Sequence, residues 1–148
     1  MKDDEYKENR KLLTNSNFFL FDEMIEIEGI KIYGTPYQKE FHKMAFNLEN
    51  PDELQQKMNL IPFGLDILMV HAPPKNKLDV HFKGENVGCE ILEKVVKEKK
   101  PKFCVFGHIH ESTGVLIEEE TIFINSAICN RKYKPNNSST IFDIEIKK

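Results

Sequence analysis

The sequence predicts an α/β fold with mixed sheets and hairpins, and three observations lead to this expectation. Two short runs, residues 65–70 and residues 103–106, are largely apolar and rich in β-branched or aromatic side chains, as buried strands are. Residues 87–100 between them repeat apolar side chains at helical spacing, so the order predicts one βαβ unit with parallel strands. Elsewhere, paired runs that alternate apolar and polar residues flank short turns, which is typical of hairpins.

Composition and charge narrow the possible classes of function. The 148 residues can form one domain with its own core, and 40% of them are hydrophobic. The net charge is −3 and the lysines are spread along the chain, so we expect no nucleic-acid polymer as a partner. The three cysteines form no Cys-x-x-Cys pair, which suits a reducing compartment. No apolar run approaches the roughly 20 residues of a membrane span, so we expect a cytoplasmic protein without membrane contact.

The N-terminal part of the chain is predicted to begin with a tail and to continue into strands. Residues 1–11 are mostly charged and should form a tail or a frayed helix ahead of a domain over residues 12–148. The aromatic and apolar residues 18–21 predict a strand. Residues 24–33 alternate apolar and polar side chains on each side of a Glu-Gly step, which predicts a hairpin.

A loop and a helix should follow this hairpin. Residues 34–47 begin with Gly-Thr-Pro-Tyr and are rich in aromatic side chains, which favours a loop or a short helix. Asn50 then precedes Pro51 and two acidic residues. Asparagine is a preferred N-cap, proline is favoured at the first helical position, and acids are stabilised near the positive end of the helix dipole. The sequence therefore predicts a helix from residue 51 to about Met58.

Both predicted buried strands lead directly into histidines. His71 follows the first strand just before two prolines, and residues 107–110 follow the second strand as a Gly-His-x-His step. Because a right-handed crossover makes the strands parallel, His71, His108 and His110 should lie at one edge of the sheet. Neutral imidazoles are common metal ligands, and the glycine before them frees the backbone. The alternative for an isolated His-x-His step is a hydrogen-bonded surface pair.

The C-terminal third is predicted to contain a second hairpin and a closing strand. Residues 114–117 and residues 121–124 flank three glutamates, which predicts a hairpin with an acidic turn. Asn125 follows this hairpin and could contact a phosphate, hydrogen-bond a ligating histidine or cap the local turn. Residues 140–146 alternate apolar and acidic side chains and are predicted to form the last strand.

Short motifs cover most of the chain in order: Tyr33-Gly34-Thr35-Pro36-Tyr37, Ala45-Phe46-Asn47-Leu48, Ile61-Pro62, Val70-His71-Ala72-Pro73-Pro74, Val87-Gly88-Cys89 and Phe106-Gly107-His108-Ile109-His110-Glu111. With these motifs the chain resembles the calcineurin-like metallophosphoesterases, most closely the metallophosphoesterase-domain-containing branch, whose members are regarded as phosphodiesterases. The resemblance implies the C-terminal half of a four-layer α-β-β-α sandwich. It also implies that His71 and His108 bind one ion of a metal pair and that His110 binds the other.

The motifs that open the family domain, Asp-x-His, Gly-Asp-x-x-Asp and Gly-Asn-His followed by an acid, do not stand in order ahead of residue 12. Asp79-Val80-His81 spells the first of them, but it follows a Pro-Pro loop and is expected to supply a loop acid and a loop histidine. We therefore expect a partial domain that lacks the N-terminal metal-binding motifs. The family site uses two divalent ions (Mn, Fe or Zn), and this chain should bind them weakly or in part.

The resemblance implies a metal-dependent phosphoesterase that hydrolyses small nucleotide-type phosphodiesters, with only the histidine ligands on this chain. Asn125 and Glu111 are candidates for contact with this phosphate-ester substrate, and no residue is assigned a catalytic role. An N-terminal half, in a longer chain or a separate polypeptide, would complete the site, and the chain alone should be inactive. The alternative is a truncated, inactive relative that acts as a nucleotide-binding or protein-interaction module.

Overall fold

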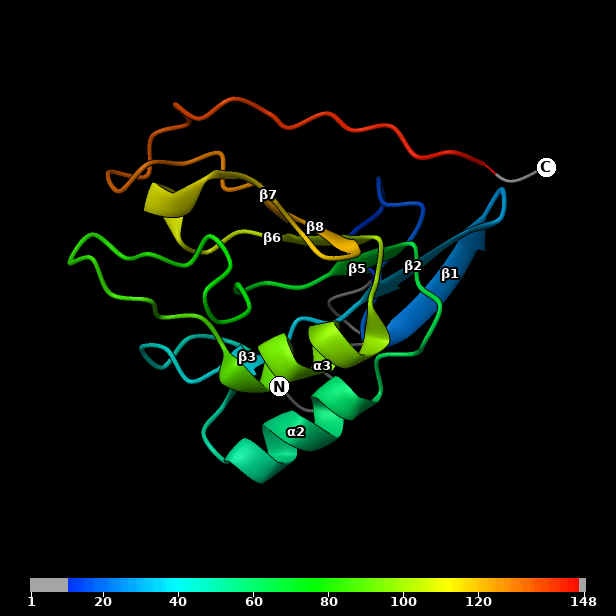
Figure 1. Ribbon diagram of the computed structural model, residues 1–148, viewed down its shortest axis with the longest axis horizontal. Coiled ribbons are helices and arrows are strands. Elements are labelled where there is room, and N and C mark those ends of the chain that lie inside the picture. Colours follow the sequence, from blue (N-terminus) through cyan, green and yellow to red (C-terminus); the bar gives the residue numbers. More distant parts are fainter. Residues whose placement is uncertain (1–10, 147–148) are drawn as a thin grey trace.

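The computed structural model describes residues 11–146, which form a six-stranded mixed sheet with two α-helices beside it (Figure 1). The predicted N-terminal tail lies outside the described residues except for residue 11. The elements in chain order are β1 (Glu23–Ile27), β2 (Ile30–Gly34), β3 (Gln38–Lys39), β4 (Asn47–Leu48), α2 (Pro51–Asn59), β5 (Ile67–Met69), α3 (Glu90–Lys99), β6 (Phe103–Phe106), the short 3-10 helix η1 (His110–Ser112), β7 (Gly114–Glu118) and β8 (Thr121–Asn125). The α/β class predicted from the sequence is confirmed.

The strand order is β1-β2-β5-β6-β8-β7, which places the parallel strands in the middle of the sheet. Strand β5 pairs in parallel with β2 and β6, and β6 pairs in parallel with β8. Strands β1 and β7 are antiparallel to their neighbours at the two edges. The predicted βαβ unit is therefore present as β5-α3-β6, and the two predicted hairpins are present as β1-β2 and β7-β8.

Side-chain caps define where both helices begin. Helix α2 has the predicted cap, because Asn50 Oδ1 accepts a hydrogen bond from Asp52 N at 2.9 Å. Helix α3 begins later than residue 87, after Cys89, whose Sγ accepts from Leu92 N at 3.4 Å. It ends at Lys99, and the following residue, Lys100, caps it with a left-handed backbone at a φ of 50°. Among residues 11–146, no helix has the length and apolar character needed to cross a bilayer.

The hydrophobic core lies between the two helices and one face of the sheet. Figure 1 shows α2 and α3 on the same side of the strands. Strand pairing aligns Tyr33, Leu68, Cys104 and Phe123 in one row across β2, β5, β6 and β8, and all four side chains are buried. The helices complete this core with Leu54, Met58, Leu92, Val95 and Val96. Burial of this face fixes the register of the central strands, because a slip of one residue would expose the row.

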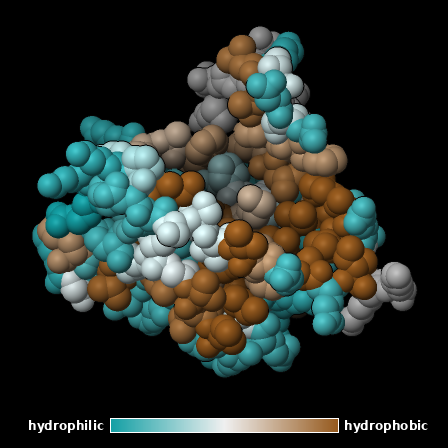
Figure 2. All heavy atoms as spheres, turned by 90° about the horizontal axis from the view of Figure 1, so that it is seen from above, coloured by the Kyte–Doolittle hydropathy of each residue, from teal (hydrophilic) through white to brown (hydrophobic). Residues whose placement is uncertain are grey.

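The opposite face of the sheet is also apolar. Pairing aligns Ile32, Ile67, Phe103 and Ile122 in a second row across the same four strands. The C-terminal segment crosses this side, away from the helices (Figure 1), and Phe142 stacks on Phe103 with ring centroids 4.5 Å apart. Figure 2 shows the molecule from this side, with hydrophobic residues gathered in a broad patch. Apolar side chains of this face that stay exposed include Ile27, Met69, Val115 and Ile117.

Two of the predicted strands, residues 18–21 and residues 140–146, are wrong, because neither segment forms a strand. In the first segment, Phe21 packs edge-on against Tyr37 and Phe46, with ring centroids 5.6 and 5.9 Å apart. In the second, Phe142 stacks on Phe103 of the sheet instead of belonging to a strand. Period-two alternation indicates an extended chain, and the partner it packs against decides whether that chain becomes a strand.

A methyl group at Gly88 should destabilise the fold. An ideal Cβ there would lie 2.4 Å from the oxygen of Pro74 and 2.7 Å from Oδ2 of Asp79, a fully buried residue. We expect Gly88→Ala to lower the free energy of unfolding by about 1–3 kcal/mol, measured by urea denaturation. Gly107→Ala is the matched control, since the atoms nearest its Cβ would lie at 3.9 Å. Equal losses in the two variants would contradict this packing.

Candidate metal-binding site

The hydrogen-bond ladder between β5 and β6 continues beyond both strands. Val70 N donates to Val105 O at 3.0 Å, and Gly107 N donates to His71 O at 3.0 Å. These bonds hold His71 and the Gly-His-x-His step in register at the carboxyl ends of two neighbouring parallel strands. That edge is where open α/β sheets bind their ligands. The structure thus brings His71 and His108 together, as the strand order predicted.

The rings of His71 and His108 meet at one point. His71 Nε2 lies 3.1 Å from His108 Nδ1, so that one ring donates a hydrogen bond to the other in the metal-free chain, and the ring centroids are 4.9 Å apart. Two nitrogens bound to one ion at about 2.0–2.1 Å would be separated by roughly 2.8–3.4 Å, for bond angles between a right angle and the tetrahedral value. The observed separation falls within this range. The pair therefore fits two ligand positions of a single ion.

The backbone of the Gly-His-x-His step turns at an unexpected residue. His108 has a φ of 67°, a left-handed conformation that costs an L-residue about 1–2 kcal/mol. The sequence indicated that Gly107 would provide the backbone freedom, but the left-handed residue is its neighbour. Strained residues of this kind persist where the surrounding structure fixes them, and they are common at functional sites. Here the strain directs the His108 ring toward His71.

Burial favours the neutral form of both imidazoles. The pKa of His108 falls from 6.5 to about 4. Burial is the main cause, and the charges of His71 and His110 contribute to the same fall. Burial also lowers the pKa of His71. Neutral imidazole is the form that binds a metal, and an ion held by both rings would displace the proton that one of the two facing nitrogens carries in their hydrogen bond.

His110 lies at the start of η1 and contacts a different loop. Its Nδ1 is 3.0 Å from the carbonyl oxygen of Asn130, and its ring meets that of Tyr133 edge-on at 5.4 Å between centroids. Across residues 11–146, no three His, Cys, Asp or Glu side chains are close enough to hold an ion together. The described residues therefore fit a metal in part, with His71 and His108 as two ligands.

Asn125 joins the loops beneath the histidines. Its side chain is fully buried, and Nδ2 donates to Ile109 O at 2.8 Å and to Leu78 O at 3.2 Å. Its Oδ1 accepts from Ala127 N at 3.2 Å. Of the roles that the sequence left open, this geometry corresponds to holding the local turn. It fixes Ile109, the residue between the two histidines of the motif.

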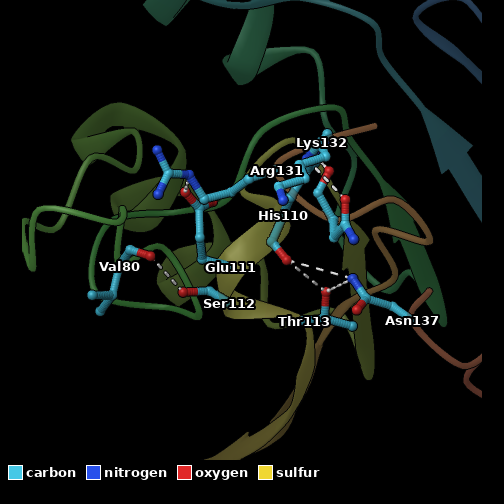
Figure 3. Close-up of polar contacts among 9 residues, drawn as sticks. Val80, His110, Glu111, Ser112, Thr113, Arg131, Lys132 and Asn137 are labelled. Atoms are coloured by element: carbon cyan, nitrogen blue, oxygen red, sulfur yellow. Dashed lines mark hydrogen bonds and ion pairs between the residues drawn. The ribbon is translucent and has the colours of Figure 1, made fainter. Parts of the chain in front are cut away.

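Glu111 lies at the rim of the site in η1. Its Oε1 is 3.4 Å from Arg131 Nε, a contact that Figure 3 shows together with the surrounding loop. The Arg131 guanidinium also lies over the ring of Phe82, 3.7 Å from its centroid. Glu111 thus links η1 to the loop that follows β8.

The Asp-x-His sequence at residues 79–81 lies in the loop between β5 and α3. Asp79 is fully buried and accepts hydrogen bonds from Asn76 N at 3.0 Å, Asn86 Nδ2 at 2.6 Å and Gly88 N at 2.8 Å. These bonds satisfy a buried carboxylate within the loop itself. Asp79 is therefore a structural acid of this loop.

The sequence did not reveal two groups that touch the histidines. Phe41, in the aromatic loop before β4, meets the His108 ring edge-on at 4.6 Å between centroids. The other group is the carbonyl oxygen of Asn130 beside His110. The only sequence signal for Phe41 was the aromatic character of its loop, and every residue has a backbone carbonyl, so no pattern pointed to Asn130.

Known proteins are similar to this chain over nearly its whole length. A UPF0046 protein of Caenorhabditis elegans is 44% identical over 138 residues, which are 93% of this chain and 35% of that protein. Metallophosphoesterase domain-containing protein 1 of Homo sapiens is 40% identical over 146 residues, which are 97% of this chain and 44% of that protein. The chain belongs to the metallophosphoesterase domain-containing family. It spans less than half the length of these two relatives, which is consistent with the half-domain predicted from the sequence.

Comparison with solved structures supports the fold of this family member. One chain of a crystal structure superposes with a TM-score of 0.58 at 15% sequence identity, covering 82% of this chain and 51% of that chain. At this identity the likeness concerns the fold alone. No family model matches the chain.

Acidification should weaken the fold through His108. Its pKa is about 4 in the folded chain and about 6.5 in the unfolded chain, so between these values the unfolded chain binds more protons and stability falls as the pH falls. We expect this residue to remove on the order of 1–2 kcal/mol from the free energy of unfolding of the metal-free chain between about pH 7 and pH 4. This is less than the full pKa shift would give, because the ring is only half-buried.

Urea denaturation at a series of pH values measures this effect. His108→Gln removes the titrating ring, so the variant should lose less stability on acidification than the wild type. An unchanged pH dependence in this variant would show that His108 is not the residue responsible.

Proposed function

We propose that this chain carries the histidine ligands of a two-metal phosphodiesterase site. The observation that carries the proposal is the pair of imidazoles, with His71 Nε2 and His108 Nδ1 3.1 Å apart at the ends of two parallel strands. Family membership adds a reason to expect divalent metal, since the human relative is named for a metallophosphoesterase domain. His71 and His108 would hold one ion, and His110 would hold its neighbour.

The metals would be manganese, iron or zinc, which all accept imidazole ligands. When bound, such a metal pair would supply positive charge to a phosphoryl group and would lower the pKa of a bound water. The residues of this chain contribute neutral rings, a fixed His108 backbone and the Phe41 ring, which shields one side of His108. Residues 11–146 bring no carboxylate that completes a three-ligand group with the pair, so the chain alone should bind metal weakly and should not turn over substrate.

The substrate class that we propose is a small nucleotide-type phosphodiester. Exposed aromatic rings lie beside the histidines, with Phe41 at His108 and Tyr133 at His110, and such rings can stack on a planar group. A net charge of −3 with dispersed lysines gives no support for a nucleic-acid polymer or a membrane as the partner. We assign Asn125 to holding the loops, and a direct contact between Glu111 and substrate stays a prediction.

The remaining ligands would come from a second part of the family domain, in a longer chain or in a separate polypeptide. The apolar face of the sheet opposite the helices supports this, because apolar rows in a sheet normally pack against a second layer. The relatives supply enough length, since this chain spans 35% and 44% of two of them. In the complete domain the described sheet and helices would be two layers of a four-layer α-β-β-α sandwich.

An inactive binding module is the second candidate. It is favoured by one observation, the absence of any three-ligand group within residues 11–146. In this case the exposed aromatic rings or the apolar sheet face would serve a nucleotide or a protein partner. Catalysis by the completed domain separates the two candidates.

The hydrolysis of bis(p-nitrophenyl) phosphate in the presence of Mn²⁺ tests the proposal. A complex of this chain with the complementary part of a relative's domain should release p-nitrophenol, while the chain alone should not. His108→Ala in that complex should lower turnover by at least about 100-fold, because metals contribute several kcal/mol to the transition state. His81→Ala is the control and should leave turnover unchanged. A folded complex without turnover would favour the binding module, and full activity of His108→Ala would refute the metal assignment.

A further inference from the structure

The loop after β8 encloses one side of His110, and Asn137 fastens this loop. Asn137 Nδ2 donates to Thr113 Oγ1 and to Ala127 O, both at 2.9 Å. It has longer contacts with Cys129 O at 3.3 Å and with His110 O at 3.5 Å. Figure 3 shows the Asn137 amide pointing at Thr113 and at the backbone of His110. One side chain thus joins the end of the loop to its start, to η1 and to the residue before β7.

Within this loop, Asn130 forms a tight turn that directs its carbonyl oxygen. Its side-chain Oδ1 accepts from Lys132 N at 2.8 Å and from Lys134 N at 3.2 Å. Its backbone N donates to Lys134 O at 2.9 Å, and its carbonyl oxygen accepts from Tyr133 N at 2.8 Å. The same carbonyl oxygen lies 3.0 Å from His110 Nδ1. The hydrogen bonds of this turn all join residues 130–134 to one another. The position of the Asn130 carbonyl oxygen relative to His110 therefore depends on how the loop is anchored to the rest of the protein.

This contact determines which nitrogen of His110 carries the proton. A carbonyl oxygen can only accept a hydrogen bond, so Nδ1 must be the donor. In a neutral imidazole the other nitrogen, Nε2, then has a free lone pair. A histidine that binds metal through one nitrogen commonly has the other nitrogen oriented by a backbone carbonyl in this way.

We propose that Asn137 is a positioning residue, which anchors the 129–137 loop so that the Asn130 carbonyl holds His110 in the Nδ1-protonated form with Nε2 available as a ligand. The use of Nε2 as a ligand rests on the proposed function, whereas the tautomer itself does not. Tyr133 supports the same ring orientation through its edge-on contact with His110. Nothing in the motif Gly-His-x-His selects between the two tautomers, so this selection comes from a loop outside the motif.

A second anchor makes the proposal testable in a folded protein. Arg131 in the same loop contacts Glu111 and lies over the ring of Phe82. The loop therefore keeps an attachment when the amide of residue 137 is lost, and substitution there should loosen it without unfolding the domain. Asn136 provides a matched control, because it is an exposed neighbour of the same type.

The experiment is long-range ¹H–¹⁵N NMR of the histidine side chains in the metal-free chain, at a pH where the imidazoles are neutral. The wild type should show His110 protonated at Nδ1. Asn137→Asp keeps the shape of the side chain but cannot donate, and it should shift the ratio of Nδ1-protonated to Nε2-protonated His110 by at least about fivefold, the equivalent of one hydrogen bond. Asn136→Asp should leave the ratio unchanged, and the signals of His71 should stay the same in all variants.

Thr113→Val gives a second test, because it keeps the side-chain volume but removes the hydroxyl that accepts from Asn137 and that also contacts His110 O and Ala127 O as a donor. Thr113→Val should shift the tautomer ratio of His110 in the same direction as Asn137→Asp. The proposal can therefore still be refuted if Asn137→Asp does not fold. A wild-type His110 protonated at Nε2, or a folded Asn137→Asp with unchanged Nδ1 protonation, would overturn the proposal. Since no metal or substrate is present, these outcomes are independent of whether the completed domain hydrolyses a phosphodiester.

Discussion

The parallel pairing of β5 with β6 is the constraint on which the candidate site depends. Leu68 and Cys104 face each other in this register, and both are fully buried under the helices. The backbone hydrogen bonds between the two strands continue to the bond from Gly107 N to His71 O, which holds His71 and His108 next to each other at the ends of the strands. A register shift of one residue would expose the core row and separate the imidazoles at once, so the hydrophobic core and the site are fixed by the same pairing.

The geometry of the candidate site supports the proposed metal binding and shows that, among residues 11–146, the ligand set is only partial. Two imidazoles with lowered pKa values lie at the spacing of ligands on one ion, while His110 is oriented by a separate loop. A catalytic ion in a protein generally has three protein ligands, and a metal pair also needs negative charge between its members. The second layer that we propose would account for both the apolar sheet face and the missing ligands, since it would pack on the sheet and carry acids to the histidines.

Much of this arrangement was predictable from the sequence because it follows from local patterns. Apolar runs and helical spacing located β5, α3 and β6, and the handedness of crossovers then placed His71 beside His108. The strand expected at residues 140–146 failed because the chain packs across a sheet face there. The Asn130 carbonyl has no sequence signature because every residue has a backbone carbonyl, and the aromatic character of the Phe41 loop did not indicate which histidine its rings would contact.

The number of metal ions bound by the purified chain tests the central claim most directly. Equilibrium dialysis against Mn²⁺ or Zn²⁺, followed by elemental analysis, should find at most one bound ion per chain, and this binding should be lost in His71→Gln but kept in His81→Gln. Two ions per chain would contradict our account of the incomplete ligand set. One ion that survives in His71→Gln would contradict the pairing of His71 with His108 as its ligands.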